Sequence, residues 1–141
     1  NGMSAVTGGS RATDEDLKWV EKLLAGSGKV LVVEEDLMDV VTATSGSGPA
    51  YFFGFVEAMV NAAVKLGLSS EDAKLLVVQT LVGSAAMLNE SGKDAKTLRE
   101  NVTSPKGTTA AALAVFDSEK WGEIVYEAMK AARDRSIELS S

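Results

Sequence analysis

One short stretch of the chain carries most of the side chains that could bind a small ligand. Residues 102–109 read VTSPKGTT, which combines hydroxyl groups with a proline, a lysine and a glycine, and the alanine-rich run AAALAVF follows at once. The pattern predicts a loop that ends at the start of a helix, where backbone N–H groups have no partner within the helix. Hydroxyls and free N–H groups bind anions. Because this stretch contains a single cation, Lys106, it suits a small carboxylate better than a nucleotide. A capped turn without a ligand is the alternative.

A second stretch, SGSGPA at residues 45–50, could bind a ligand for a related reason. Two glycines let a backbone come close to a ligand, and the start of a helix at Pro49 would present free N–H groups. The alternative is an ordinary corner between two helices with a serine cap. A nucleophilic serine is excluded because no strand precedes this stretch and the chain contains no histidine.

The composition excludes several classes of function. The chain has 141 residues without histidine or cysteine, which rules out Ser-His-Asp catalysis, thiol chemistry, zinc–thiolate sites and disulfides, and we expect no metal site. The net charge of −6 disfavours a nucleic-acid partner. No run is long and apolar enough to span a bilayer, and the N-terminus lacks the pattern of a signal peptide. We therefore expect a cytoplasmic protein without nucleic-acid or membrane partners.

The elements that would position these two stretches are mostly helical. Residues 1–36 predict a β-α-β unit, with a helix that Thr13 and Asp16 cap and an apolar stripe of Leu17, Val20, Leu23 and Leu24 on that helix. Residues 37–141 predict helices only. We expect these helices at 37–43, from Pro49 to Gly67, at 70–90 after a Ser69 cap, after Asp94, from the 102–109 loop to Phe116, and from Ser118 onwards. The predicted fold is mostly α, with a domain boundary after residue 36.

The long helix over residues 50–66 is too apolar for a small monomer. Its clearly polar residues are Glu57, Asn61 and Lys65, whose spacing of four places them in one narrow stripe. A helix that is apolar around the rest of its circumference is buried on nearly all sides. We therefore expect a homodimer with interlocked helices, and a compact monomeric bundle is the alternative. Assembly beyond the dimer is left open.

Several separated blocks in this chain resemble one enzyme family. The blocks DLMDVVTATSGSGPAYFFGFVEAM, AAVKLGL, QTLVGSAAML and LRENVTSPKGTTAAAL occur in the same order as in the C-terminal half of pyrroline-5-carboxylate reductases, whose signature usually reads SPGGTT. The resemblance implies an all-helical dimerisation domain and the reduction of 1-pyrroline-5-carboxylate to L-proline with NADPH or NADH. Such a reduction needs no nucleophile, because the cofactor supplies the hydride.

The resemblance also implies roles for individual residues. Thr109 would be the polar group close to the reacting imine, and the carbonyl of Val102 would face the ring nitrogen. The substrate carboxylate would be bound by Ser104, Lys106, Gly107, Thr108 and Thr109. The nicotinamide would lie near Ser45, Gly46, Ser47, Gly48 and Pro49. Lys106 stands where the family has glycine; we expect it to have a negative φ. The Lys106 side chain would either point to solvent or contact the substrate carboxylate.

The dinucleotide fingerprint G-x-G-x-x-G does not occur after a strand in this sequence. The resemblance therefore implies that residues 1–36 are the end of a truncated Rossmann domain and that residues 37–141 form the dimerisation and substrate-binding domain. We expect such a fragment to be inactive alone, and the preference between NADPH and NADH stays open. A helical homodimerisation module without chemistry of its own is the alternative function.

Overall fold

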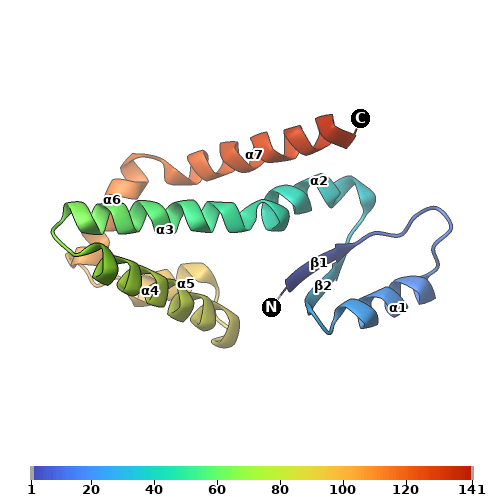
Figure 1. Ribbon diagram of the computed structural model, residues 1–141, viewed down its shortest axis with the longest axis horizontal. Helices are drawn as coiled ribbons and strands as arrows, with labels where there is room; N and C mark the ends of the chain where they lie inside the picture. The colour runs from blue at the N-terminus through green and yellow to red at the C-terminus, as the bar shows by residue number, and fades with distance from the viewer. Residues whose placement is uncertain (1, 141) are drawn as a thin grey trace. The chain divides into compact units, whose positions relative to one another are not determined.

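The computed structural model describes residues 2–140, which divide into two compact units (Figure 1). One unit comprises Asn1–Pro49 together with Val125–Ser141, and the other comprises Ala50–Ile124. This division differs from the predicted boundary after residue 36, because residues 37–49 and most of the last helix group with the N-terminal residues. The predicted domain boundary stays a prediction.

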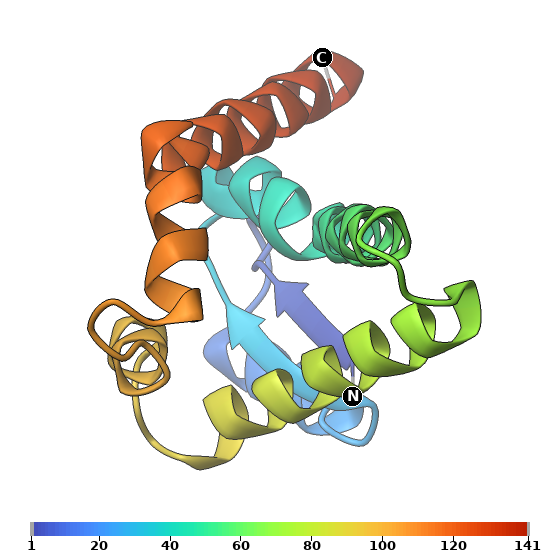
Figure 2. The same ribbon diagram turned by 90° about the vertical axis from the view of Figure 1, so that its left-hand side faces the viewer.

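The first unit begins with the expected β-α-β arrangement. Strands β1 (Gly2–Val6) and β2 (Gly28–Val32) are parallel, with Gly2 opposite Gly28 and Val6 opposite Val32, and Figure 2 shows both arrows running the same way. Helix α1 (Asp14–Leu24) connects them. Thr13 caps α1, because its Oγ1 accepts from the N–H of Asp16 and its own N–H donates to the Asp16 carboxylate at 2.9 Å.

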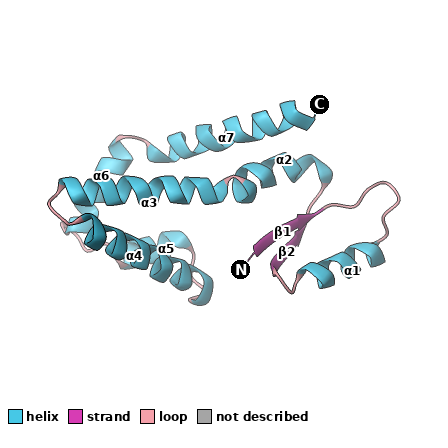
Figure 3. Ribbon diagram, in the orientation of Figure 1, coloured by secondary structure: helices cyan, strands magenta, loops and turns pink. Residues whose placement is uncertain are grey.

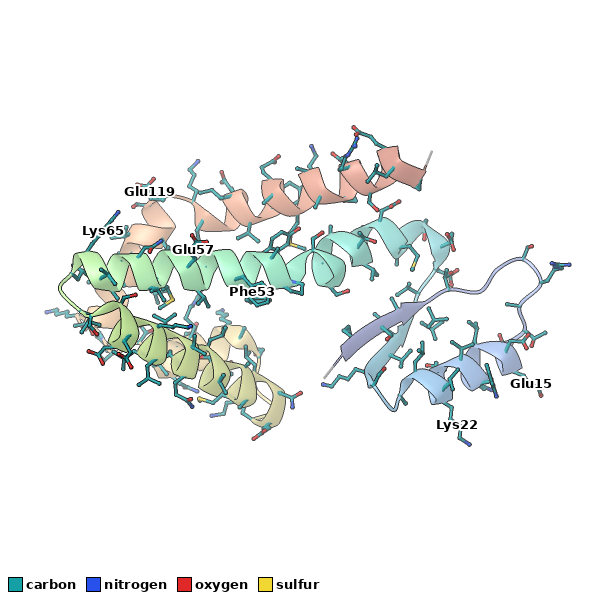
Figure 4. All side chains as sticks on the ribbon, in the orientation of Figure 1. Glu15, Lys22, Phe53, Glu57, Lys65 and Glu119 are labelled. Carbon is teal, nitrogen blue, oxygen red and sulfur yellow. The ribbon has the colours of Figure 1, made fainter. Side chains whose placement is uncertain are left out.

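The predicted apolar stripe of α1 is partly wrong. Leu17, Val20 and Leu24 are half-buried, but Leu23 is 64% exposed. Since α1 turns 100° per residue, Leu23 lies too far around the helix to reach the strands with the other three. Lys22, on the exposed side, points away from the strands (Figure 4).

Between β2 and the long helix α3, the chain is helical almost without interruption. A 3₁₀ turn (η1, Glu35–Leu37), a short helix α2 (Met38–Val41) and a π-helical segment (η2, Thr42–Gly46) lead into α3 (Gly48–Lys65). The predicted end of the helix at residue 43 is therefore wrong. Hydroxyl groups stabilise this path: Thr42 and Thr44 donate to the carbonyls of Met38 and Val40 at 3.0 and 2.7 Å.

The second unit consists of helices (Figure 3). It contains α3 from Ala50 onwards, α4 (Ser70–Glu90), α5 (Ala95–Asn101) and α6 (Thr108–Ser118), and α7 (Trp121–Ser140) begins in it. Gly67 ends α3 with a φ of 111°, and Ser69 caps α4 by accepting from the N–H of Asp72 at 3.0 Å.

The predicted start of the last helix at Ser118 is wrong. Helix α6 continues through Ser118, and the break comes at Lys120, which has a φ of 53°. Phe116 packs near this break, with its ring centroid 6.5 Å from that of Phe55 and 5.7 Å from that of Trp121. The predicted class, mostly α with a small parallel sheet, is confirmed. None of the helices within residues 2–140 has the length and apolar character needed to cross a membrane.

Candidate functional site

The centre of the 102–109 stretch is a tight turn. The N–H of Gly107 donates to the carbonyl of Ser104 at 3.0 Å, with Pro105 and Lys106 as the two central residues. Proline fixes a negative φ at the first central position, and Lys106 has a φ of 60° at the second, which is the pattern of a type II turn. The prediction of a negative φ at Lys106 is wrong, because this turn type requires left-handed backbone there.

Gly107 is needed for a different reason. Its φ of −80° is ordinary, so no backbone strain is involved. A Cβ at this position would meet the hydroxyl of Ser104 and would lie 3.1 Å from the Ser104 carbonyl oxygen. The glycine thus permits the close approach that the turn needs.

Helix α6 starts directly after this turn and leaves hydrogen-bond donors free. Gly107 is its N-cap and supplies no side chain, and the first N–H bonded across the cap is that of Ala111, which donates to the Gly107 carbonyl at 3.1 Å. Within residues 2–140, no hydrogen bond joins the following groups to another atom: the N–H groups of Thr108, Thr109 and Ala110, and the hydroxyls of Ser104, Thr108 and Thr109. Several donors therefore converge on one helix end with a favourable dipole for an anion.

On the other side of the turn, α5 ends at Asn101. The Asp94 carboxylate caps the start of α5 by accepting a hydrogen bond from the N–H of Thr97 at 2.8 Å. This bond and a second hydrogen bond from the Thr97 hydroxyl lower the pKa of Asp94 from its usual 3.8. Val102 is the C-cap of α5, and its carbonyl accepts no hydrogen bond within the described part of the chain. That carbonyl is available to an external N–H group.

Thr103 is a residue that the sequence reasoning missed. Its N–H donates to the carbonyl of Glu100 at 3.1 Å, and its Oγ1 donates to the carbonyl of Arg99 at 2.6 Å. Thr103 as a whole is half-buried, although its hydroxyl bond to Arg99 is exposed. The signal in the sequence was a threonine four residues after Arg99 at a helix end, where hydroxyls often bond backward.

Two apolar clefts flank α5 within the second unit. One has a volume of about 210 Å³ and is lined by Ser84, Met87, Leu88, Ala95, Leu98, Arg99 and Val102. The other has a volume of about 290 Å³ and is lined by Arg99, Glu100, Thr103, Ala110, Leu113, Ala114 and Asp117. The predicted ligands of residues 104–109 line neither of these two clefts.

The 45–49 stretch differs from its prediction. Ser45 donates its hydroxyl to the carbonyl of Val41 at 3.2 Å, and the N–H of Ser47 donates to the carbonyl of Thr42 at 2.8 Å. Within this segment the hydroxyl of Ser45 and the N–H of Ser47 are therefore already bonded to helical residues that precede them. Ser47 is half-buried with a hydroxyl that has no hydrogen bond within the described residues, and Gly48 is buried. The wide turn itself is of a kind often found at functional sites.

The structure thus assembles the predicted residues in two groups. Val102, Ser104, Lys106, Gly107, Thr108 and Thr109 come together around one turn of the second unit, whereas Ser45, Gly46, Ser47, Gly48 and Pro49 belong to the first unit. No group of three metal-ligating side chains exists within residues 2–140.

Comparison with known proteins decides the family. The family described as pyrroline-5-carboxylate reductase dimerisation matches residues 35–139. The chain belongs to this family. Pyrroline-5-carboxylate reductases from Corynebacterium melassecola and Haemophilus influenzae are 45% and 42% identical over 98% and 99% of this chain. The alignments cover 51% and 52% of those relatives, so the chain spans about half their length.

Solved structures of the pyrroline-5-carboxylate reductase family share the fold. The Coxiella burnetii reductase matches 98% of this chain and 52% of its own, with a TM-score of 0.93 and 37% identity. A Plasmodium falciparum pyrroline carboxylate reductase with NADP bound matches 97% of this chain and 56% of its own, with a TM-score of 0.86 and 34% identity. The resemblance seen in the sequence is confirmed.

A pyrophosphate would not fit the described part of this family member. Among residues 2–140, the only helix that follows a strand in β-α-β fashion is α1, and its first turn holds Asp14, Glu15 and Asp16. Their charge and the Thr13 cap oppose an anion at this helix end, and no glycine-rich turn precedes it in the fingerprint spacing. The start of α1 therefore does not suit the phosphates of a dinucleotide.

Proposed function

We propose that this chain is the dimerisation and substrate-binding part of a cytoplasmic pyrroline-5-carboxylate reductase. The reaction is the reduction of 1-pyrroline-5-carboxylate to L-proline with NADPH or NADH, the last step of proline biosynthesis. The observation that carries the proposal is the set of unpaired donors around the 102–109 turn, in a chain whose family match begins at residue 35. In this proposal residues 1–36 end a dinucleotide-binding domain, and residues 37–141 form the helical domain.

The substrate is a cyclic imine that carries a carboxylate. Its carboxylate would accept hydrogen bonds from the free N–H groups of Thr108 and Thr109 and from the hydroxyl of Ser104, next to the helix dipole of α6. Gly107 lets the turn close, and Lys106 borders the site with an exposed ammonium group. Fixing the carboxylate fixes the ring and lowers the entropy lost in reaching the reactive geometry.

The imine nitrogen first takes a proton from water; the hydride then adds to the imine carbon, and the C=N π electron pair moves to the ring nitrogen, which keeps that proton. The nicotinamide supplies the hydride when it is bound, and the proposed neighbours of its ring are Ser45, Gly46, Ser47, Gly48 and Pro49. The free carbonyl of Val102 would accept from the ring N–H, which favours the protonated nitrogen. The hydroxyl of Thr109 would donate near the same atom. No histidine or cysteine is needed for these steps.

We also propose that the chain forms a homodimer through α3 and α4. Large apolar side chains on both helices are exposed in the single chain, including Phe53 at 71% and Leu76 at 55%, and Figure 4 shows Phe53 on α3. The accessible surface of the chain is 10924 Å² for a mass of 14.7 kDa. A folded monomer of that mass exposes about 6,900 Å², so about 4,000 Å² is in excess. Obligate interfaces bury about 2,000–5,000 Å² counted over both partners, so a dimer interface would cover part of this excess.

The test uses the full natural protein that carries this chain. NADPH oxidation at 340 nm is measured with 1-pyrroline-5-carboxylate, and L-proline is measured as the product. Ser104→Ala and Thr109→Val should each raise KM or lower kcat about tenfold or more, whereas Ser10→Ala, an exposed position outside the proposed interface helices, should leave both unchanged. Absence of proline formation by the unaltered protein would refute the proposal.

The second candidate is a helical homodimerisation module without chemistry. The acidic start of α1 favours it for the chain alone, since no described residue group would hold a dinucleotide phosphate. Isothermal titration of the 141-residue chain with NADPH should show no binding at micromolar concentrations. Clear binding or turnover by the chain would contradict this expectation and would place the cofactor site within it.

A further inference from the structure

We infer that Thr103, which lies between two proposed ligands of the substrate, is a positioning residue for the reduction. The inference rests on the proposed function. In this inference Thr103 does not contact the substrate. The Thr103 hydroxyl donates to the Arg99 carbonyl at 2.6 Å, and the Thr103 N–H donates to the Glu100 carbonyl at 3.1 Å, so both groups bind the last turn of α5.

The N–H bond of Thr103 determines where the Val102 carbonyl points. The two groups belong to the same peptide unit, and no cis peptide occurs within the described residues. In a planar trans peptide the C=O and the N–H point in opposite directions. Because the N–H of Thr103 points to the Glu100 carbonyl of α5, the carbonyl of Val102 must point away from that helix end. This leaves it unpaired and available to the ring nitrogen.

The hydroxyl bond of Thr103 keeps this peptide unit from rotating. A residue just beyond a helix end is held by few hydrogen bonds, and helix ends fray. The Oγ1 bond to the Arg99 carbonyl adds a second tether four residues back and satisfies a carbonyl that the helix itself leaves open. Without it, the Thr103 N–H bond alone would orient the Val102 carbonyl.

Thr103 also fixes the starting point of the turn that binds the carboxylate. The next residue, Ser104, accepts from the N–H of Gly107, which caps α6. The turn is thus anchored to α6 at Gly107 and to α5 at Thr103. No other side chain of residues 102–109 has a hydrogen bond within the described part of the chain. The distance between the ring-nitrogen acceptor and the carboxylate donors depends on both anchors.

The test compares Thr103→Val, which keeps the shape and removes the hydroxyl, with Thr103→Ser, which keeps the hydroxyl, in the full natural protein. Thr103→Val should raise KM for 1-pyrroline-5-carboxylate and the inhibition constant of L-proline about 3- to 10-fold, the range expected for one hydrogen bond. KM for NADPH should stay within twofold, and Thr103→Ser should restore the substrate KM. A purely structural loss would instead lower kcat through fewer folded molecules with KM unchanged.

Ser84→Ala is the matched control, because the Ser84 hydroxyl makes the same kind of bond to the Thr80 carbonyl at 2.8 Å but lies within α4. Its substrate KM should not change. A Thr103→Val variant with unchanged KM, or a Thr103→Ser variant that stays impaired, would overturn the inference. If the unaltered protein makes no proline, the proposed function fails separately. Amide hydrogen exchange at Gly107 then decides: faster exchange in Thr103→Val supports the anchoring of the turn, and unchanged exchange refutes it.

Discussion

Replacing Lys106 by glycine should stabilise the chain. Lys106 has a φ of 60° at the second central position of the 104–107 turn. Left-handed backbone costs a residue with a Cβ about 1–2 kcal/mol, and glycine avoids this cost. Glycine also loses more conformational freedom on folding, which offsets about 0.5–1 kcal/mol. The net expectation is a gain of about 0.5–1 kcal/mol in the free energy of unfolding.

Urea unfolding at fixed protein concentration measures this gain, because a dimer's stability depends on concentration. Lys106→Ala is the control: it removes the same long side chain but keeps the Cβ, so it should not be stabilised. Lys120→Gly tests the same reasoning at the break between α6 and α7, where φ is 53°. There the gain should be smaller, since the ion pair of Lys120 with Glu123 at 3.7 Å is lost.

A Lys106→Gly variant no more stable than Lys106→Ala would refute the assignment of strain to this residue. The same variants separate the two options for the lysine side chain in the full natural protein. If Lys106→Gly leaves KM for 1-pyrroline-5-carboxylate unchanged, the ammonium group faces solvent during the reaction. A rise of tenfold or more, with a loss of salt sensitivity, would make it a ligand of the carboxylate.

Three further predictions concern assembly and stability. Ala62→Glu, on the exposed surface of α3, should convert the dimer to monomer or unfolded chain in sedimentation equilibrium at low micromolar concentration, since an unpaired charge would be buried; an unchanged dimer would contradict the proposed interface. Ser69→Ala should lower the free energy of unfolding by about 0.5–2 kcal/mol through loss of the α4 cap, and Ser70→Ala should not. Hydrogen bonds from Thr13 lower the pKa of Asp16 from its usual 3.8, so its contribution to stability is complete above that pH and disappears as the pH falls through the lower folded value. Asp16→Asn should therefore flatten the acid side of the stability–pH curve, and an unchanged acid side would count against this reasoning.

The features that sequence reasoning predicted correctly depend on neighbours within one helical turn. The caps at Thr13, Ser69 and Asp94 each bond an N–H group three residues later, so residue type and spacing suffice to place them. The β-α-β unit follows from alternating strand and helix periods. The 102–109 loop was found because a turn proline and hydroxyls precede an alanine-rich helix.

The features that sequence reasoning missed depend on the conformation of the folded backbone and on which elements pack against each other. The composition of SGSGPA favours a corner, yet back-bonding hydroxyls carry the helix through a π segment into α3. Leu23 has the same apolar character as Leu24, and only the position of the strands decides which of the two is covered. At Lys106 the amino-acid type argues against a positive φ, yet the folded turn between Ser104 and Gly107 is of type II, which places its second central residue in left-handed backbone.

By itself, the sequence determined the class of fold, the capped helix starts and the family, and it predicted a stretch that would bind a carboxylate. Only the tertiary structure decided which polar groups are free. The hydroxyl of Ser45 is used within its own helix, whereas the N–H groups of Thr108 and Thr109 and the carbonyl of Val102 have no partner in the described chain. The reason is physical: residue type sets what a group can donate or accept, but the folded backbone path determines whether that capacity is already satisfied.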